Sequence, residues 1–114
     1  MKWVALCSVA LLMVVGCHSN TYALRDQAIE KFELGQLDES KPLLDQVFAK
    51  LPSDGPNLYY LGRVAHARGY YERAVYWYLC CLDADPKMEV AKPWLKKARE
   101  QAGLAGYTVE LNLP

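Results

Sequence analysis

The chain has 114 residues, of which 53% are hydrophobic and 23% are charged, and its formal net charge at pH 7 is zero. This length suits one compact domain. Because the charges balance, the chain lacks the basic excess with which nucleic-acid-binding proteins neutralise phosphates, and we expect no nucleic-acid partner.

The first element in chain order is a mainly apolar run over residues 3–15, which follows the basic Lys2. The run holds about 13 residues, whereas a helix that crosses a bilayer needs roughly 20. A basic start, a short apolar run and a small residue before the break are typical of a secretory signal. We therefore predict that residues 1–16 are a cleaved signal peptide, with an uncleaved N-terminal anchor as the alternative.

The end of this run, Val14-Val15-Gly16-Cys17, resembles the lipobox of bacterial lipoproteins. In that family a diacylglycerol is attached to the cysteine, a peptidase cuts before it, and the new amine is usually acylated. The resemblance implies lipidation at Cys17, with residues 17–21 as a short tether, and two or three acyl chains make a durable anchor. A signal peptide that ends in cysteine by chance is the alternative. Because His18 follows the cysteine, the family's sorting rule implies the outer membrane, facing the periplasm.

From Tyr22 to Gln101 the sequence is typical of helices, with no run of strict alternation. The helices are separated by turn-forming residues at Gly35, Pro52 to Pro56, Gly69 and Pro86. The two glycines are 34 residues apart, and Pro52 and Pro86 are also 34 apart. This period is that of tetratricopeptide repeats.

Residues 55–86 resemble one tetratricopeptide repeat almost completely, at Leu58, Leu61, Gly62, Ala65, Gly69, Ala74, Tyr78 and Pro86. Gly62 and Ala74 are expected to let two helices approach closely, and Gly69 to adopt a turn conformation that other residues resist. The preceding repeat, residues 21–54, matches less well, as terminal repeats often do.

After Pro86, we predict one more helix over residues 88–102. Its inward residues would be Trp94, Leu95 and Ala98, and its water-facing residues Lys92, Lys96, Lys97 and Arg99. The predicted fold is therefore all-α, a short α-solenoid of two tetratricopeptide-type helix pairs plus a C-terminal capping helix, over residues 22–102. Residues 103–114 would be a tail that alternates like a strand, either loosely packed or donated to another chain.

Only Cys80 and Cys81 remain once Cys7 leaves with the signal and Cys17 carries lipid. Adjacent residues on a helix point about 100° apart, which does not suit a disulfide between them. No second pair or histidine spacing indicates zinc. We interpret Cys81 as a core residue and Cys80 as the more exposed thiol, for which a disulfide to another chain stays open.

Catalytic patterns are missing from the sequence, which has only His18 and His66 as histidines, no G-x-S-x-G turn and no phosphate-binding glycine-rich loop. We expect no enzymatic activity, cofactor, metal or small-molecule substrate.

The tetratricopeptide resemblance instead implies a concave groove, lined by the first helix of each pair, for a protein or peptide. Carried onto this chain, the groove residues are Arg25, Ile29, Phe32, Tyr59, Arg63, His66 and Lys97. An aromatic and mildly basic surface suits a peptide with apolar anchors and a carboxylate. The alternative is an ordinary solvated helix face.

The expected function is that of a membrane-anchored adaptor or assembly factor of the bacterial cell envelope. The alternative is a permanent structural subunit of a larger envelope complex. An uncovered aromatic face, for which Tyr76 and Trp77 are candidates because Tyr78 takes the inward position, would favour the permanent subunit.

Overall fold

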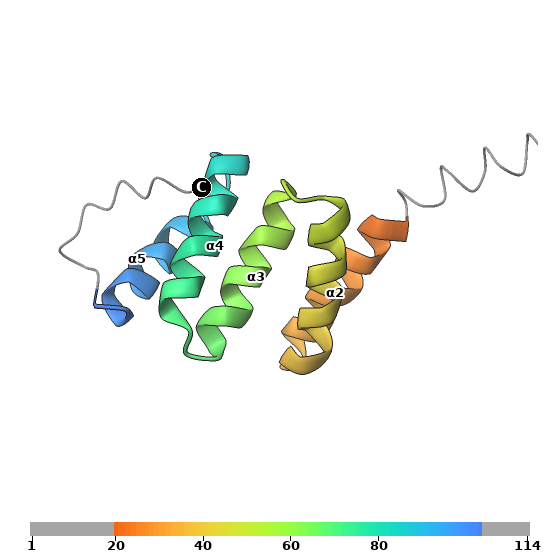
Figure 1. Cartoon of the computed structure of the whole chain (residues 1–114), viewed down its shortest axis with the longest axis horizontal. Coiled ribbons are helices and arrows are strands. Elements are labelled where there is room, and N and C mark those ends of the chain that lie inside the picture. The colour runs from red at the N-terminus through yellow and green to blue at the C-terminus, as the bar shows by residue number, and fades with distance from the viewer. Residues whose placement is uncertain (1–19, 104–114) are drawn as a thin grey trace, which may run out of the picture. The chain divides into compact units, whose positions relative to one another are not determined.

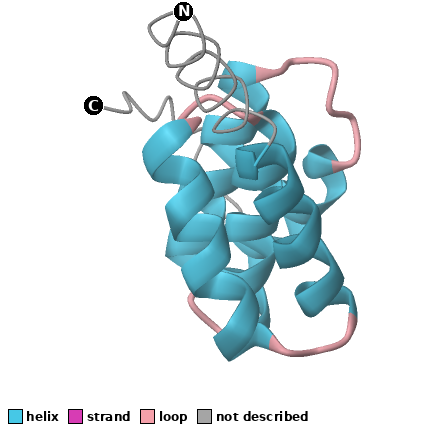
Figure 2. Cartoon of the chain, turned by 90° about the vertical axis from the view of Figure 1, so that its right-hand side faces the viewer, coloured by secondary structure: helices cyan, strands magenta, loops and turns pink. Residues whose placement is uncertain are grey.

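The computed structural model describes residues 20–103, and within this range the chain forms helices and turns without a strand (Figures 1 and 2). The all-α class is thus confirmed. The chain divides into two compact units between Leu51 and Pro52. The predicted signal peptide, the lipidation site Cys17 and residues 104–114 of the tail lie outside the described residues.

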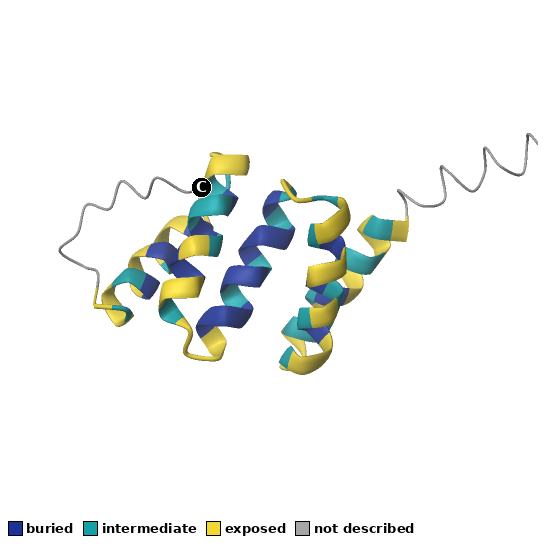
Figure 3. Ribbon diagram, in the orientation of Figure 1, coloured by how far each residue is buried: buried dark blue, intermediate teal, exposed yellow. Residues whose placement is uncertain are grey.

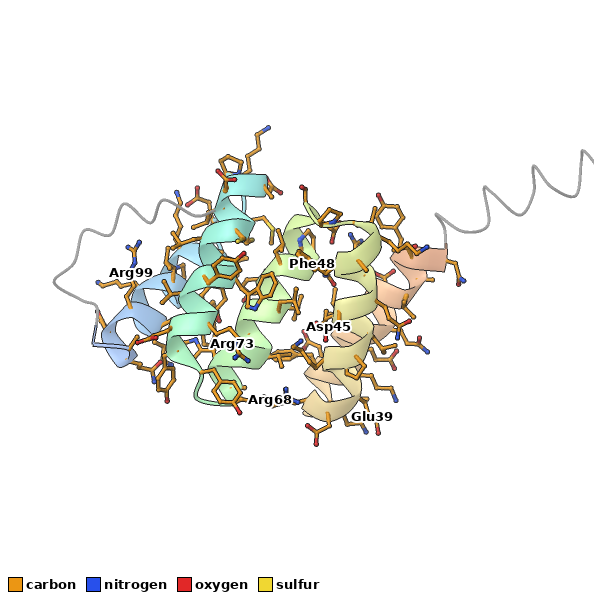
Figure 4. All side chains as sticks on the ribbon, viewed as in Figure 1. Glu39, Asp45, Phe48, Arg68, Arg73 and Arg99 are labelled. Carbon is orange, nitrogen blue, oxygen red and sulfur yellow. The ribbon has the colours of Figure 1, made fainter. Side chains whose placement is uncertain are left out.

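The first unit contains a helix over residues 20–33 and helix α2, Leu37–Lys50. Gly35 turns the chain between them with a φ of 76°, which a residue with a Cβ resists. The helices are joined by a buried hydrogen bond of 2.7 Å, in which Ser40 Oγ donates to the carbonyl oxygen of Ala28. An ion pair of 3.1 Å between Lys31 and Glu39 adds a second link, near the start of α2 (Figure 4).

The second unit contains α3 (Gly55–Ala67), α4 (Tyr71–Ala84) and α5 (Ala91–Gln101). Asp54 caps α3, because its Oδ2 accepts a 3.0 Å hydrogen bond from the N–H of Asn57. Pro56 lies in the first turn, where its missing N–H costs little. Helix α4 packs against both α3 and α5, so it forms the centre of this unit (Figure 1).

Helices α3 and α4 approach each other closely at Gly62. A Cβ placed on Gly62 would lie 2.5 Å from Cε1 of Tyr78, closer than real Cβ contacts. Tyr78 is fully buried, as predicted, and α3 is buried along most of its length (Figure 3). The predicted close approach at Gly62 is confirmed, and the group that needs the space is the Tyr78 ring.

The 34-residue period of the sequence recurs in the backbone. Helices α2 and α4 begin and end 34 residues apart, and their N-cap residues have φ and ψ of −87° and 69° and of −89° and 69°. Positive φ occurs among the described residues at Gly35, Gly69 and Gly103, with values of 76°, 81° and 75°. Each glycine N–H donates to the carbonyl three residues earlier, at Phe32, His66 and Glu100. The first helix of each unit and α5 therefore end in the same turn, although the sequence pattern indicates this turn only at the first two glycines.

Helix α5 differs from its prediction in two respects. It begins at Ala91 instead of residue 88, because Asp85 holds the preceding turn: its carbonyl accepts from the N–H of Met88, and its Oδ1 accepts from that of Lys87. Arg99 was expected to face water but is half-buried on α5 (Figure 4). Its Nε is buried without a hydrogen-bond partner among residues 20–103.

The remaining predictions for α5 agree with the structure. Lys92, Lys96 and Lys97 are exposed, and Leu95 and Ala98 are buried. Trp94 is half-buried, so part of its ring stays accessible.

Candidate binding surface

Two cations lie against the half-buried indole of Trp94 in the second unit. The guanidinium carbon of Arg63, on α3, lies 3.6 Å from the centroid of the Trp94 ring, and Lys97 Nζ, one turn along α5, lies 5.2 Å from it. Cations this close to a tryptophan ring are attracted by its negative face. Together with Tyr59, we call these residues the Trp94 cluster.

Tyr59 orients the Arg63 side chain through a hydrogen bond. Arg63 Nη1 donates a 2.9 Å hydrogen bond to Tyr59 Oη. The Tyr59 side chain is itself 5% exposed and packs on Tyr60 and Tyr78, with ring centroids 5.1 and 6.1 Å away. The accessible part of the cluster is therefore formed by Arg63, Trp94 and Lys97.

His66, on α3, packs against the Trp94 cluster and links all three helices of the second unit. Its Nε2 is hydrogen-bonded to Gln101 Oε1, and its Nδ1 lies 3.2 Å from Tyr78 Oη. Since an amide oxygen only accepts, Nε2 carries the proton and Nδ1 accepts from the Tyr78 hydroxyl. The imidazole also meets the Trp94 ring edge-on, with centroids 5.4 Å apart. His66 thus packs edge-on against the Trp94 ring and helps to hold it in place.

The Tyr78 hydroxyl stays protonated in this network. Burial raises the pKa of Tyr78 far above its usual value, and the positive charge of Arg63 offsets only part of this rise. The Tyr78 hydroxyl therefore keeps its proton near neutral pH.

The predicted groove residues of the first unit are half-buried on the helix over residues 20–33. Arg25 lies over the Tyr22 ring, 5.1 Å from its centroid, and its Nε is 3.7 Å from Asp26 Oδ1. Ile29 and Phe32 follow on the same helix. These three residues and the four of the second unit belong to separate units, and one groove lined by all seven stays a prediction.

Sequence reasoning missed two residues of this surface. Trp94 was assigned only an inward role, although its place three residues before Lys97 puts both side chains on one helix face. Gln101 was not considered, because an i to i+35 contact with His66 leaves no local signal. Tyr59 and His66 were expected on an open face, but both are buried, at 5% and 8% exposure.

Hollows occur in both units of the described chain. One of about 440 Å³ lies at the start of α4 and is lined by Gly69, Tyr70, Tyr71, Glu72, Arg73 and Ala102. Another, of about 370 Å³, lies in the first unit, where its lining includes Leu24 of the first helix and Lys50 at the end of α2. Within residues 20–103, no three His, Cys, Asp or Glu side chains cluster as metal ligands would. No helix in this part of the chain has the length and hydropathy needed to cross a membrane.

The two cysteines have the environments that the sequence indicated. Cys81 is fully buried and its thiol donates to the carbonyl of Gly55 at 3.4 Å. Burial raises the pKa of Cys81 to about 11 and also raises that of the half-buried Cys80. Few thiolates form at neutral pH under these conditions, which does not favour thiol chemistry. The exposed Tyr76 hydrogen-bonds to Cys80, and this contact is the main cause of the raised pKa of the Tyr76 hydroxyl.

Compared with protein-family models, curated proteins and solved structures, the chain shows no significant match.

Proposed function

We propose that this protein is a membrane-anchored protein–protein interaction module, an adaptor or assembly factor of the bacterial cell envelope. The anchor is the lipid on Cys17, and the location is the outer membrane, facing the periplasm. Residues 14–17 at the end of a signal-like run support this proposal. The 34-residue recurrence of turns and helix ends supports a short solenoid of two tetratricopeptide-type pairs and a capping helix.

The observation that carries the binding proposal is the Trp94 cluster. An accessible indole with Arg63 and Lys97 against it offers an apolar plate and two cations. The plate suits an apolar or aromatic side chain of a peptide, and the guanidinium can form charge-assisted hydrogen bonds with a carboxylate. Arginine and tryptophan are also the residue types that contribute most to protein interfaces.

A second proposal, a permanent subunit of a larger envelope complex, is favoured by a different set of residues. Tyr76 and Val90 are 38% and 50% exposed, and the Tyr76 ring packs edge-on against Trp77 with centroids 5.2 Å apart. Exposed apolar area of this kind often marks an interface that is covered in the assembly.

Capture of partners from detergent extracts tests the adaptor proposal. Arg63→Ala should weaken capture of a bound protein about ten- to hundredfold, which corresponds to about 1.5–3 kcal/mol for a lost charge-assisted hydrogen bond. Lys97→Ala should have a smaller effect in the same direction. Lys96→Ala is the matched control, since Lys96 is an exposed lysine on the same helix outside the cluster. Equal capture by all three variants and wild type would show that partners dock elsewhere.

Two further variants complete the test. Tyr59→Phe keeps the buried ring and removes only the hydroxyl that orients Arg63, so it should weaken capture while the melting temperature stays close to wild type. Cys17→Ser tests the anchor: labelling with a radioactive fatty acid should be lost and the protein released from membranes. Retained label on the serine variant would reject the lipoprotein part of the proposal alone.

A further inference from the structure

An acidic row runs along the outer face of the helix over residues 20–33. Its members are Asp26, Glu30 and Glu33, which follow the spacing i, i+4, i+7 and are all exposed. Residues at this spacing lie on one helix face. The row is flanked by Tyr22 and Leu34, which are 45% and 63% exposed, so the same face also presents apolar area.

A basic row with the same spacing runs along α5, at the other end of the described chain. Lys92 and Lys96 are exposed, and the half-buried Arg99 completes the row. This face of α5 is separate from the Trp94 cluster, which uses Trp94 and Lys97.

The net charge of each unit has the same sign as the row that it contains. Residues 20–51 carry four Lys or Arg and six Asp or Glu, whereas residues 52–103 carry eight and six. The formal charges are therefore −2 and +2. Within the rows, Asp26 has a neighbouring cation at 3.7 Å in Arg25, and Lys92 pairs with Glu89 at 2.9 Å. The Lys92–Glu89 pair is solvent-exposed on both sides and competes weakly with a partner's charges. Arg25 is half-buried, but the Asp26 side chain is itself 73% exposed, and its 3.7 Å separation from Arg25 exceeds hydrogen-bond distance.

We propose that these rows are the two sides of a contact between copies of this chain. The basic row of one copy docks on the acidic row of the next. In both rows the second and third charges lie about 6 and 10 Å along the helix from the first, given the rise of an α-helix, so three ion pairs can form in register when the helices are parallel. The contact is heterologous, and each pair of copies leaves one row of each sign unused, so association can continue along a line.

This inference does not depend on the partner-binding proposal, because it uses neither the Trp94 cluster nor the lipid. A contact made of exposed charges is screened at physiological salt, where the Debye length is about 8 Å. We therefore expect association that grows with protein concentration and weakens as salt is added. A contact between the two rows of a single chain would instead be independent of concentration.

The test uses the full chain in a non-ionic detergent, with mass measured by sedimentation and the detergent contribution subtracted. At low salt, the mass of the wild type should rise with protein concentration and return toward that of the monomer at about 0.5 M salt, where the Debye length falls to a few ångströms. Two charge reversals are compared: Asp26→Lys with Glu30→Lys, and Lys92→Glu with Lys96→Glu. In each variant alone, two of the three charges in one row then have the sign of the other row, and the variant should stay monomeric.

Mixing the two reversed variants is the decisive step, because each again meets a row of opposite sign and association should return. The matched control for the lysine reversal is Lys50→Glu with Lys87→Glu, which makes the same change in net charge at exposed positions outside both rows. Alone, this control should associate as the wild type does. Arg63→Ala should also associate as wild type does. A wild-type mass that is independent of concentration, association of either reversed variant alone, or failure of the mixture to associate would each overturn the proposal.

Discussion

The two helical hairpins of the chain, residues 20–50 and residues 55–84, have nearly the same backbone and different interiors. Their turns place Gly35 and Gly69 at φ of 76° and 81°. Between the helices, the first hairpin has the polar contact from Ser40 to Ala28, whereas the second packs the Tyr78 ring on Gly62. A turn glycine and second helices of equal length therefore set the backbone, and quite different side chains can fill the space between the helices.

The largest expected effect comes from breaking the contact that only the second hairpin has. Gly62→Leu places a branched side chain where even a Cβ lies 2.5 Å from the Tyr78 ring. Overpacking of this kind typically costs about 1–3 kcal/mol, and we expect a loss near 3 kcal/mol in the free energy of unfolding. Urea unfolding followed by circular dichroism measures it. An unchanged midpoint would contradict the close approach.

A matched double variant sharpens this comparison. Positions 28 and 44 of the first hairpin correspond to 62 and 78, and they hold Ala28 and Leu44, both fully buried. Gly62→Ala with Tyr78→Leu copies this combination into the second hairpin. Gly62→Ala alone should lower the free energy of unfolding, although alanine is favoured over glycine in a helix by about 1 kcal/mol. Adding Tyr78→Leu should remove the steric part of that loss.

The next effect concerns pH, because the fully buried Val47 of the first hairpin corresponds to Cys81 in the second. The pKa of Cys81 rises from 9.0 to about 11 on folding. Between these values the unfolded chain has released a proton that the folded chain keeps, so the free energy of unfolding falls as pH rises. The slope approaches about 1.4 kcal/mol per pH unit only midway between the two pKa values, so the loss from Cys81 between pH 9 and 11 amounts to about 2 kcal/mol.

Urea unfolding at several pH values between about 8 and 11 measures this slope. Cys81→Val copies Val47 and has no thiol to titrate, so its stability should fall less over the same range. Tyr78 contributes a further loss above pH 10 in both chains, because its pKa is also raised. Equal slopes for wild type and Cys81→Val would show that the thiol of Cys81 is not held protonated by the fold.

Smaller effects on stability are expected at Ser40 and at its counterpart in the second hairpin, Ala74. Both side chains are fully buried. Ser40→Ala removes one hydrogen bond to a helix carbonyl and should cost about 1 kcal/mol. Ala74→Ser buries a hydroxyl in an apolar contact and should cost about 2 kcal/mol when it finds no acceptor. Thermal melting of both variants checks the order of the two losses. A larger loss for Ser40→Ala than for Ala74→Ser would contradict the view that the first hairpin has the polar contact and the second the apolar one.

Most of the fold could be predicted from local signals. Gly35, Gly69 and the 34-residue spacing mark the turns, and the inward positions of Tyr78 and Cys81 follow from helical periodicity. The start of α5 could not be predicted, because the hydrogen bonds that Asp85 accepts compete with helix formation after Pro86.

The candidate site was less predictable than the fold. Arg63 and Lys97 were expected there, but the indole between helices that holds them was not. Trp94 is reached from α3 only through tertiary packing, and large aromatics on a helix are interpreted by default as core. For the same reason, the burial of Tyr59 and His66 has no signal in the residues next to them.

The smallest effect tests what the two hairpins share. A Cβ on Gly35 or on Gly69 would meet no heavy atom within 4 Å, so alanine at either position is penalised only by its positive φ. That penalty is about 1 kcal/mol, and we expect Gly35→Ala and Gly69→Ala to lower the free energy of unfolding by equal amounts. Asparagine tolerates this conformation better than alanine, so Gly35→Asn and Gly69→Asn should each lose less. If the alanine variants differ by more than about 0.5 kcal/mol, which exceeds the usual effect of an exposed substitution, the turns are not equivalent in energy despite their equal geometry.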